Sequence, residues 1–142
     1  MERLKNWDIR LWAFLERAEG KSFQWGQHDC VLFACNCIKK ITGLDVAKPW
    51  RGKYKTLRGA TGLLRRIAGG GLEEVAEKIA AENNFEEVPV NFARRGDVVL
   101  CHSKLGPALC VVGSDGAFAV GPGPDGMERV PIAECSRAWR IS

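Results

Sequence analysis

Residues 30–41, CVLFACNCIKKI, are almost wholly apolar and constrain the fold more than any other stretch of the chain. Asp29 directly precedes them and can cap a helix, because its carboxylate accepts the unpaired N–H groups of the first turn. Gly43 follows at a position where helices commonly end. A helix this apolar must be buried on most of its circumference. We therefore expect residues 30–41 to form the central helix of the fold.

Helical patterns also occur on either side of this segment. Ile9, Trp12 and Leu15 lie at helical spacing, and Leu11 and Phe14 widen the apolar stripe that they form. Farther along the chain, three consecutive glycines separate two shorter helical patterns. The additional helices are predicted at residues 8–18, 57–68 and 72–83.

The C-terminal part of the chain has a different pattern, in which short β-type runs alternate with turn residues. The runs are DVVL, ALCVV, AFAV, MERVPI and SRAWRI, and the turns include SKLGP, GSDG and GPGPDG. We expect an antiparallel sheet of about four or five strands. Helices followed by strands indicate an α+β fold rather than alternating βαβ units. The length suits a single domain over residues 1–142.

The net charge of +4 is unevenly distributed along the sequence. Residues 46–72 contain seven Lys or Arg and no acid, whereas residues 73–87 contain six Glu and one Lys. We expect two helix surfaces of opposite charge that attract each other. Nucleic-acid binding by the basic stretch is the alternative, but no alternation of aromatic and basic residues and no known motif favours it.

Charged residues interrupt the apolar positions of the N-terminal stretch MERLKNWDIRLWAFLERAEG, which therefore lacks the pattern of a signal peptide. No segment approaches the roughly 18 apolar residues that span a membrane. We expect synthesis in a cytoplasm, with the six cysteines reduced and most of them buried as small apolar residues. Zinc binding is the alternative for these cysteines, but the chain has no C-x-x-C pair. We expect no metal and no cofactor.

Cys30 is predicted to lie in the first turn of the central helix, where backbone N–H groups and the helix dipole favour a thiolate. Asp29 opposes this effect unless its carboxylate is turned away as a cap. Acyl-transfer cysteines also need a histidine that takes and returns the proton. His102, at the turn after DVVL, is the better candidate, because His28 is too close in sequence to face Cys30. The structural alternatives are a buried cysteine, a loop histidine bonded to backbone and an exposed turn histidine.

The segments WGQHDCVLF and RRGDVVL resemble those of the papain-like cell-wall cysteine peptidases of the NlpC type. The chain more closely resembles the small bacteriophage and prophage tail-associated branch of that superfamily. The segments that carry this resemblance occur in the order FQWGQHDC, TGLD, RGKYKT, RRGDVVL, DGMERVPI and RAWRIS, and it covers residues 5–142. It implies a papain-like fold whose helical half carries the nucleophile and whose antiparallel sheet carries the histidine. By position, it matches Cys30 to the nucleophile, Asp29 to the acid before it, and Gly96 and Asp97 to the start of the first core strand.

The chain departs from the pattern of active members at the histidine. The matching position, at the start of the next strand, is Ala108, and the third polar residue would fall near Ala119 or Val120. The resemblance therefore implies a tail-tip or assembly component with a degenerate peptidase site. Its partners would be other phage tail proteins, and it would pass from the bacterial cytoplasm into the virion tail. The alternative is an active peptidoglycan amide hydrolase that cleaves peptide stems, with Cys30 attacking and His102 transferring the proton.

Overall fold

The computed structural model describes residues 2–103 and 106–142. Within them, four α-helices come before all six strands of an antiparallel sheet, which confirms the predicted α+β class. The helices are α1 (Trp7–Ala18), α2 (Cys30–Thr42), α3 (Leu57–Ala68) and α4 (Leu72–Asn83), with two short 3-10 helices, η1 (Val90–Phe92) and η2 (Ile132–Glu134). The strands are β1 (Glu87–Val88), β2 (Val98–Ser103), β3 (Gly106–Val112), β4 (Phe118–Gly123), β5 (Gly126–Pro131) and β6 (Arg137–Trp139).

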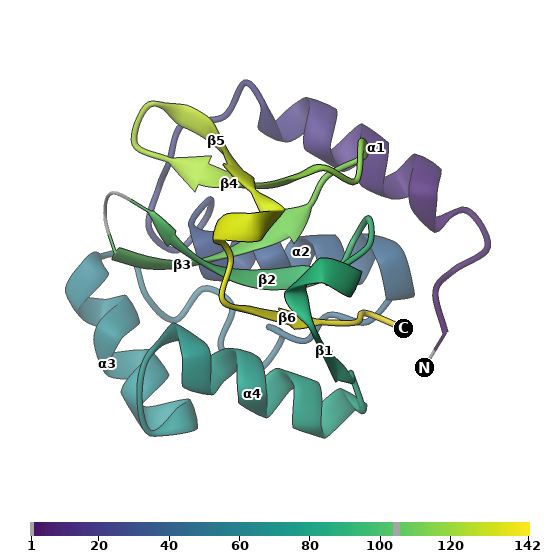
Figure 1. Cartoon of the computed structure of the whole chain (residues 1–142). Helices are drawn as coiled ribbons and strands as arrows, with labels where there is room; N and C mark the ends of the chain where they lie inside the picture. The colour runs from purple at the N-terminus through teal and green to yellow at the C-terminus, as the bar shows by residue number, and fades with distance from the viewer. Residues whose placement is uncertain (1, 104–105) are drawn as a thin grey trace.

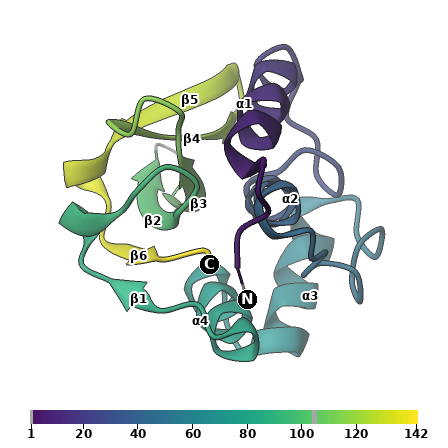
Figure 2. The same ribbon diagram turned by 90° about the vertical axis from the view of Figure 1, so that its right-hand side faces the viewer.

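The strand order is β1-β6-β2-β3-β4-β5, so the last strand of the chain lies inside the sheet (Figure 1). The sheet has more strands than the expected four or five because β1 has only two residues, too few for a pattern of alternation. Figure 2 shows the sheet on one side and α1, α2 and α3 on the other, with α4 below. The two ends of the chain lie close together in the same view.

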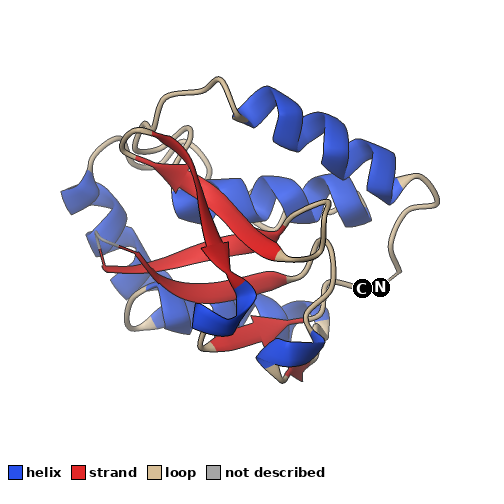
Figure 3. Ribbon diagram, turned by 45° about the horizontal axis from the view of Figure 1, so that its top comes forward, coloured by secondary structure: helices blue, strands red, loops and turns tan. Residues whose placement is uncertain are grey.

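Helix α2 is the central helix, as its apolar sequence predicts. It lies beside α1 and packs against the sheet, mainly against β3 (Figure 3). One side of α2, including Phe33 and Ile41, joins the core that α1 and the sheet share, and the other side, including Leu32, packs toward α3 and α4. Gly43 ends the helix in the left-handed conformation, with φ of 83°.

Helix α1 buries a different stripe from the one that its sequence predicts. Leu11, Phe14 and Ala18 are buried, whereas Ile9 and Trp12 remain 66% and 54% exposed. The prediction that the stripe centres on Ile9 and Trp12 was therefore wrong, whereas Leu11 and Phe14, which were expected to widen it, are buried. The buried face is set by contact with α2, which the spacing of apolar residues in α1 does not reveal.

Both faces of the sheet are buried, and alternate residues of each strand serve opposite faces. Leu100 of β2 and Leu109 of β3 point into the core shared with the helices. Cys101 and Cys110 point to the other face, where a smaller apolar cluster is completed by residues of the η1 and η2 segments. This alternation decides which residues of β2 and β3 can face Cys30.

Candidate functional site

Cys30 is the first residue of α2, and Asp29 is the N-cap, as the sequence predicts. The Cys30 side chain keeps partial exposure, and its sulfur lies close enough to the backbone of Leu109 in β3 for that backbone to lower its pKa. The candidate nucleophile thus lies between the start of the central helix and the middle of the sheet.

The Asp29 carboxylate is fully buried and is occupied by structural donors. It accepts hydrogen bonds from the Leu32 N–H at 3.0 Å, from the Gly26 N–H at 2.8 Å and from the Tyr54 hydroxyl at 2.6 Å. These donors come from the helix, from the preceding loop and from the segment before α3. Asp29 therefore ties three segments together, and neither imidazole is among its hydrogen-bond partners in the described chain.

The loop before Cys30 is closed on itself by backbone contacts. Gln24 and His28 exchange two backbone hydrogen bonds, at 3.0 and 2.8 Å. Gly26, between them, has a φ of +84°, and a Cβ at this position would overlap the carbonyl oxygen of Tyr54. Only glycine fits there without strain. The sequence WGQHDC is thus explained by the geometry of a tight turn that leads into a capped helix.

The surroundings of Cys30 disfavour its thiolate. Burial raises the pKa of the Cys30 thiol to about 11, and the Asp29 carboxylate raises it further, whereas backbone hydrogen bonds at Leu109 and in the first turn of α2 offset part of the rise. The helix start does favour the thiolate, as expected, but desolvation is the larger effect. The sulfur is therefore protonated at neutral pH.

His28 is buried and packs its ring edge-on against Phe33, with the ring centres 6.1 Å apart. Burial lowers the pKa of His28, and nearby Lys21 lowers it further, so the imidazole is neutral at pH 7. No hydrogen bond joins it to the Cys30 sulfur within the described residues. His28 therefore lies in the loop with its backbone bonded to Gln24 and its ring packed on Phe33.

His102 lies in β2, opposite Pro107 of β3, and its side chain is exposed. It is on the same face of the sheet as Leu100 and Leu109, two residues beyond Leu100 along the strand. It borders a groove of about 500 Å³ at the start of α4, and Cys30 is not among the described residues that line this groove. The lining residues are Gly71, Leu72, Glu73, Glu74, Leu100, His102, Pro107, Ser136 and Arg137. No hydrogen bond joins His102 to Cys30 in the described part of the chain.

The position matched to the histidine of active peptidases faces away from α2. Ala108 packs into the cluster on the far side of the sheet, whereas its neighbour Leu109 faces the helices. A histidine at 108 would therefore point away from Cys30, and the residue facing α2 is the 1% exposed Leu109. The third polar residue of the peptidase pattern was matched to Ala119 or Val120. Ala119 lies in the apolar cluster on the side of the sheet away from α2, and Val120 lies in the core shared with the helices.

Asp97, in the matched Gly-Asp pair, is also a fully buried structural carboxylate. It accepts hydrogen bonds from the Arg3 guanidinium at 2.9 Å, from the Arg94 N–H at 2.8 Å and from the Ile141 N–H at 3.2 Å. Gly96 has a φ of +87° and leaves no room for a side chain beside Ile41. The pair joins the two ends of the chain to the start of β2.

Tyr54 and Arg3 are the residues of these two clusters that sequence reasoning missed. Tyr54 is the only tyrosine, in an otherwise polar segment, and this was a signal that its ring would be anchored in the core. No comparable signal marks Arg3, whose partners are 92 to 138 residues away in sequence.

The two charged stretches do not pair with each other in the described residues, contrary to expectation. The acidic side chains of α4 pair instead with Arg137 of β6, from Glu73 at 3.2 Å and from Glu77 at 3.5 Å. In the basic stretch, Arg51 pairs with Asp45 at 2.8 Å, and the three Arg residues of α3 are exposed.

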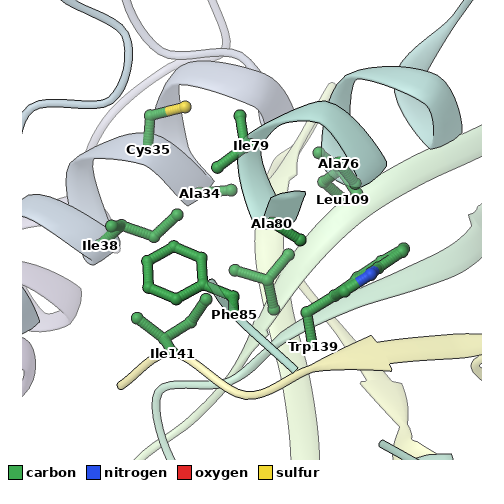
Figure 4. A pocket seen from close by; sticks show the side chains of 11 residues that line it. Ala34, Cys35, Ile38, Ala76, Ile79, Ala80, Phe85, Leu109, Trp139 and Ile141 are labelled. Atoms are coloured by element: carbon green, nitrogen blue, oxygen red, sulfur yellow. The ribbon is translucent and has the colours of Figure 1, made fainter. Parts of the chain in front are cut away.

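A small cavity lies between α2, α4 and the sheet (Figure 4). It measures about 20 Å³, close to the space of one water molecule, and its lining is apolar. It is a gap in the core rather than a ligand site. In residues 2–103 and 106–142, no group of three or more His, Cys, Asp or Glu side chains is arranged to bind a metal ion. None of the helices in these ranges is long and apolar enough to span a membrane.

The model of a family described as a domain of unknown function, DUF6950, matches residues 2–141. A search of curated proteins finds no match.

Proposed function

The chain belongs to the DUF6950 family, which it matches over nearly its whole length, and we propose that it is a non-catalytic NlpC-like module of a bacteriophage or prophage tail. In this role it is a tail-tip or assembly component that contacts other tail proteins. It is made in the bacterial cytoplasm and is then assembled into the virion tail. The sequence resemblance supports the tail association, and the chemistry of Cys30 supports the loss of catalysis.

The observation that carries the proposal is the position of Cys30, which packs against the apolar cluster between α2 and α3 and has no hydrogen bond to an imidazole in the described residues. With a pKa of about 11, about one thiol in ten thousand is ionised at pH 7. A cysteine nucleophile reacts as the thiolate, and enzymes of this kind lower its pKa with a neighbouring imidazole. Cys30 is instead desolvated and lies next to the Asp29 carboxylate, and both raise the pKa of its thiol. These surroundings suit a core residue and not a nucleophile.

The rest of the peptidase-like pattern is also accounted for by folding. Asp29 and Gly26 close the loop before α2, and Asp97 holds the ends of the chain beside β2. A scaffold can keep such residues after its chemistry is lost, because they stabilise the fold itself. Their presence therefore supports the ancestry that the resemblance implies without requiring activity.

A peptidoglycan amide hydrolase is the second candidate, and one observation favours it. Cys30 lies at the start of a helix beside Leu109, and His102 is on the same face of the sheet as Leu109. If His102 swung toward Cys30, the pair could cleave an amide bond in a peptide stem. Cys30 would attack the carbonyl, His102 would pass the proton to the leaving amine, and water would then release the acyl group.

Purified peptidoglycan distinguishes the two candidates. We expect the wild-type chain and Cys30→Ser to release the same background of soluble fragments, measured by mass spectrometry. We also expect both forms to be incorporated equally into tail particles purified from an induced prophage that encodes the chain. New peptide fragments that appear with the wild type and are lost with Cys30→Ser would favour the hydrolase. Absence of the chain from the tail particles would contradict the assembly role.

A further inference from the structure

Three cysteines meet on the face of the sheet opposite α2. Cys101 lies in β2, Cys110 lies in β3, and Cys135 lies between η2 and β6. The Cys101 and Cys135 sulfurs are 3.0 Å apart, although the residues are 34 positions apart in sequence. Both side chains are buried: Cys101 is 0% exposed, and Cys135 is 8% exposed.

The backbone already holds these two cysteines in place. Ser136, next to Cys135, donates its N–H to the carbonyl oxygen of Leu100, next to Cys101, at 2.9 Å. Beyond this contact, β6 continues as the neighbour of β2, with Arg137 opposite Leu100. A bond between the sulfurs, about 2 Å long, therefore needs them to approach by only about 1 Å.

Cys110 is a poorer partner for Cys101. In the register of β2 and β3, Cys101 is opposite Ala108, so Cys110 is its diagonal neighbour. The Cα atoms of such diagonal pairs are about 7–8 Å apart, beyond the usual range for a disulfide. The Cys110 side chain also hydrogen-bonds to Cys101, but the 3.0 Å approach of the Cys101 and Cys135 sulfurs favours the pair formed by Cys101 and Cys135.

We propose that Cys101 and Cys135 are an oxidation site, at which a peroxide converts two thiols into an intramolecular disulfide. Cys135 reacts first because it is the more exposed of the two, at 8% against 0% for Cys101. Its thiolate attacks hydrogen peroxide, forming a sulfenic acid and releasing hydroxide, which takes up the thiol proton as water. The Cys101 sulfur then attacks the sulfenic sulfur, and a second water leaves with the remaining oxygen. In sum, two thiols lose two electrons and two protons, and one peroxide becomes two waters.

The disulfide would fasten β6 to β2 in the interior of the sheet. A cross-link between residues this far apart restricts the unfolded chain, so the oxidised protein unfolds at a higher temperature. For a chain of this size we expect a rise of roughly 5–10 °C in the midpoint of thermal unfolding. The reaction is slow at neutral pH because the pKa of both thiols is raised. Hydrogen bonding with Cys110 and burial raise the pKa of Cys101, although hydrogen bonding with Cys135 offsets part of the rise. Hydrogen bonding with Cys101 and burial raise the pKa of Cys135.

Peptide mapping of the wild-type chain tests the proposal directly. Trypsin separates the three cysteines into peptides 96–104, 105–129 and 130–137. The folded protein is treated with hydrogen peroxide at pH 8, its remaining thiols are blocked with N-ethylmaleimide in denaturant, and it is digested without reductant. We expect most molecules to yield peptide 96–104 joined to peptide 130–137, at the summed mass less two hydrogens, and the product to be cleaved by a phosphine reductant.

Two variants serve as matched controls. Cys110→Ser should form the same cross-link and show the same rise in unfolding temperature, whereas Cys135→Ser should show neither. A cross-link from peptide 96–104 to peptide 105–129 would overturn the proposal. Oxidation of Cys135 to sulfinic acid without a cross-link would also overturn it. A third contrary result would be that N-ethylmaleimide still blocks Cys101 and Cys135 completely after a peroxide dose that oxidises a free-thiol standard.

Discussion

Asp29 is a buried carboxylate that has no cationic partner among the described residues, and three hydrogen bonds compensate for its burial. A buried carboxylate is costly unless hydrogen-bond donors surround it. Asp29 therefore requires the donors of Gly26, Leu32 and Tyr54 to stay in place. This accounts for the sequence around Cys30 at the level of single residues. The acid that precedes the candidate nucleophile shapes the loop and raises the pKa of the thiol rather than activating it.

The burial of His28 predicts a pH dependence of stability. Burial lowers the pKa of His28 below its ordinary value of 6.5. The unfolded chain therefore binds a proton at this residue at a higher pH than the folded chain does. Stability is fully present above about pH 6.5 and falls as the pH drops through the lowered pKa of the folded state.

Urea unfolding at pH 7.0, 6.0 and 5.0 measures this effect. The wild type should lose more unfolding free energy between pH 7.0 and 5.0 than His28→Gln does. His102→Gln, which changes an exposed histidine, is the control and should follow the wild type. Equal losses in the wild type and His28→Gln would show that His28 is not the titrating group.

At the scale of elements, the helices were predictable and the sheet only partly so. Local sequence marks where α2 begins and ends, through its cap, its apolar run and its final glycine. Local glycines likewise mark the break between α3 and α4. The two-residue strand β1 and the insertion of β6 between β1 and β2 depend on contacts between distant segments. The face of the sheet on which Ala108 lies was not predictable for the same reason, because strand register decides which face a side chain takes.

The loop that leads into α2 gives the prediction at this scale. Gly26→Ala should lower the unfolding free energy by about 2 kcal/mol or more, since its positive φ disfavours a side chain and the Cβ would overlap Tyr54. Gly20→Ala is the matched control, because Gly20 has open space around it and no left-handed conformation. Chemical denaturation measures both variants. A Gly26→Ala variant as stable as Gly20→Ala would contradict the described loop geometry.

At the scale of the whole molecule, Asp97 joins the start of β2 to both ends of the chain. Arg3 donates to Asp97 and also to the backbone oxygens of Arg95 and Ile141, while Arg140 approaches Asp97 at 3.5 Å. These contacts close the fold around the central sheet. They were not predictable from sequence, because nothing local marks Arg3 as the partner of a residue 94 positions away.

Asp97→Asn tests this closure. The variant should lose about 2–3 kcal/mol of unfolding free energy, because two partly buried arginines are left without their carboxylate. Asp115→Asn, which alters an exposed loop carboxylate, should change stability by less than about 0.5 kcal/mol. Thermal and urea unfolding compare the two variants. A loss in Asp97→Asn no larger than that in the control would mean that the termini are not held in this way.

The most direct test of the proposed loss of catalysis is the pH dependence of Cys30 alkylation by iodoacetamide, followed by tandem mass spectrometry of peptide 22–39. With a thiol pKa of about 11, the rate should rise about tenfold per pH unit from pH 7 to 9.5 without a plateau. It should be the same in His102→Ala. A rapid reaction at pH 7 that is lost in Cys30→Ser, reaches a plateau below about pH 8.5 and is slowed by His102→Ala would contradict this account.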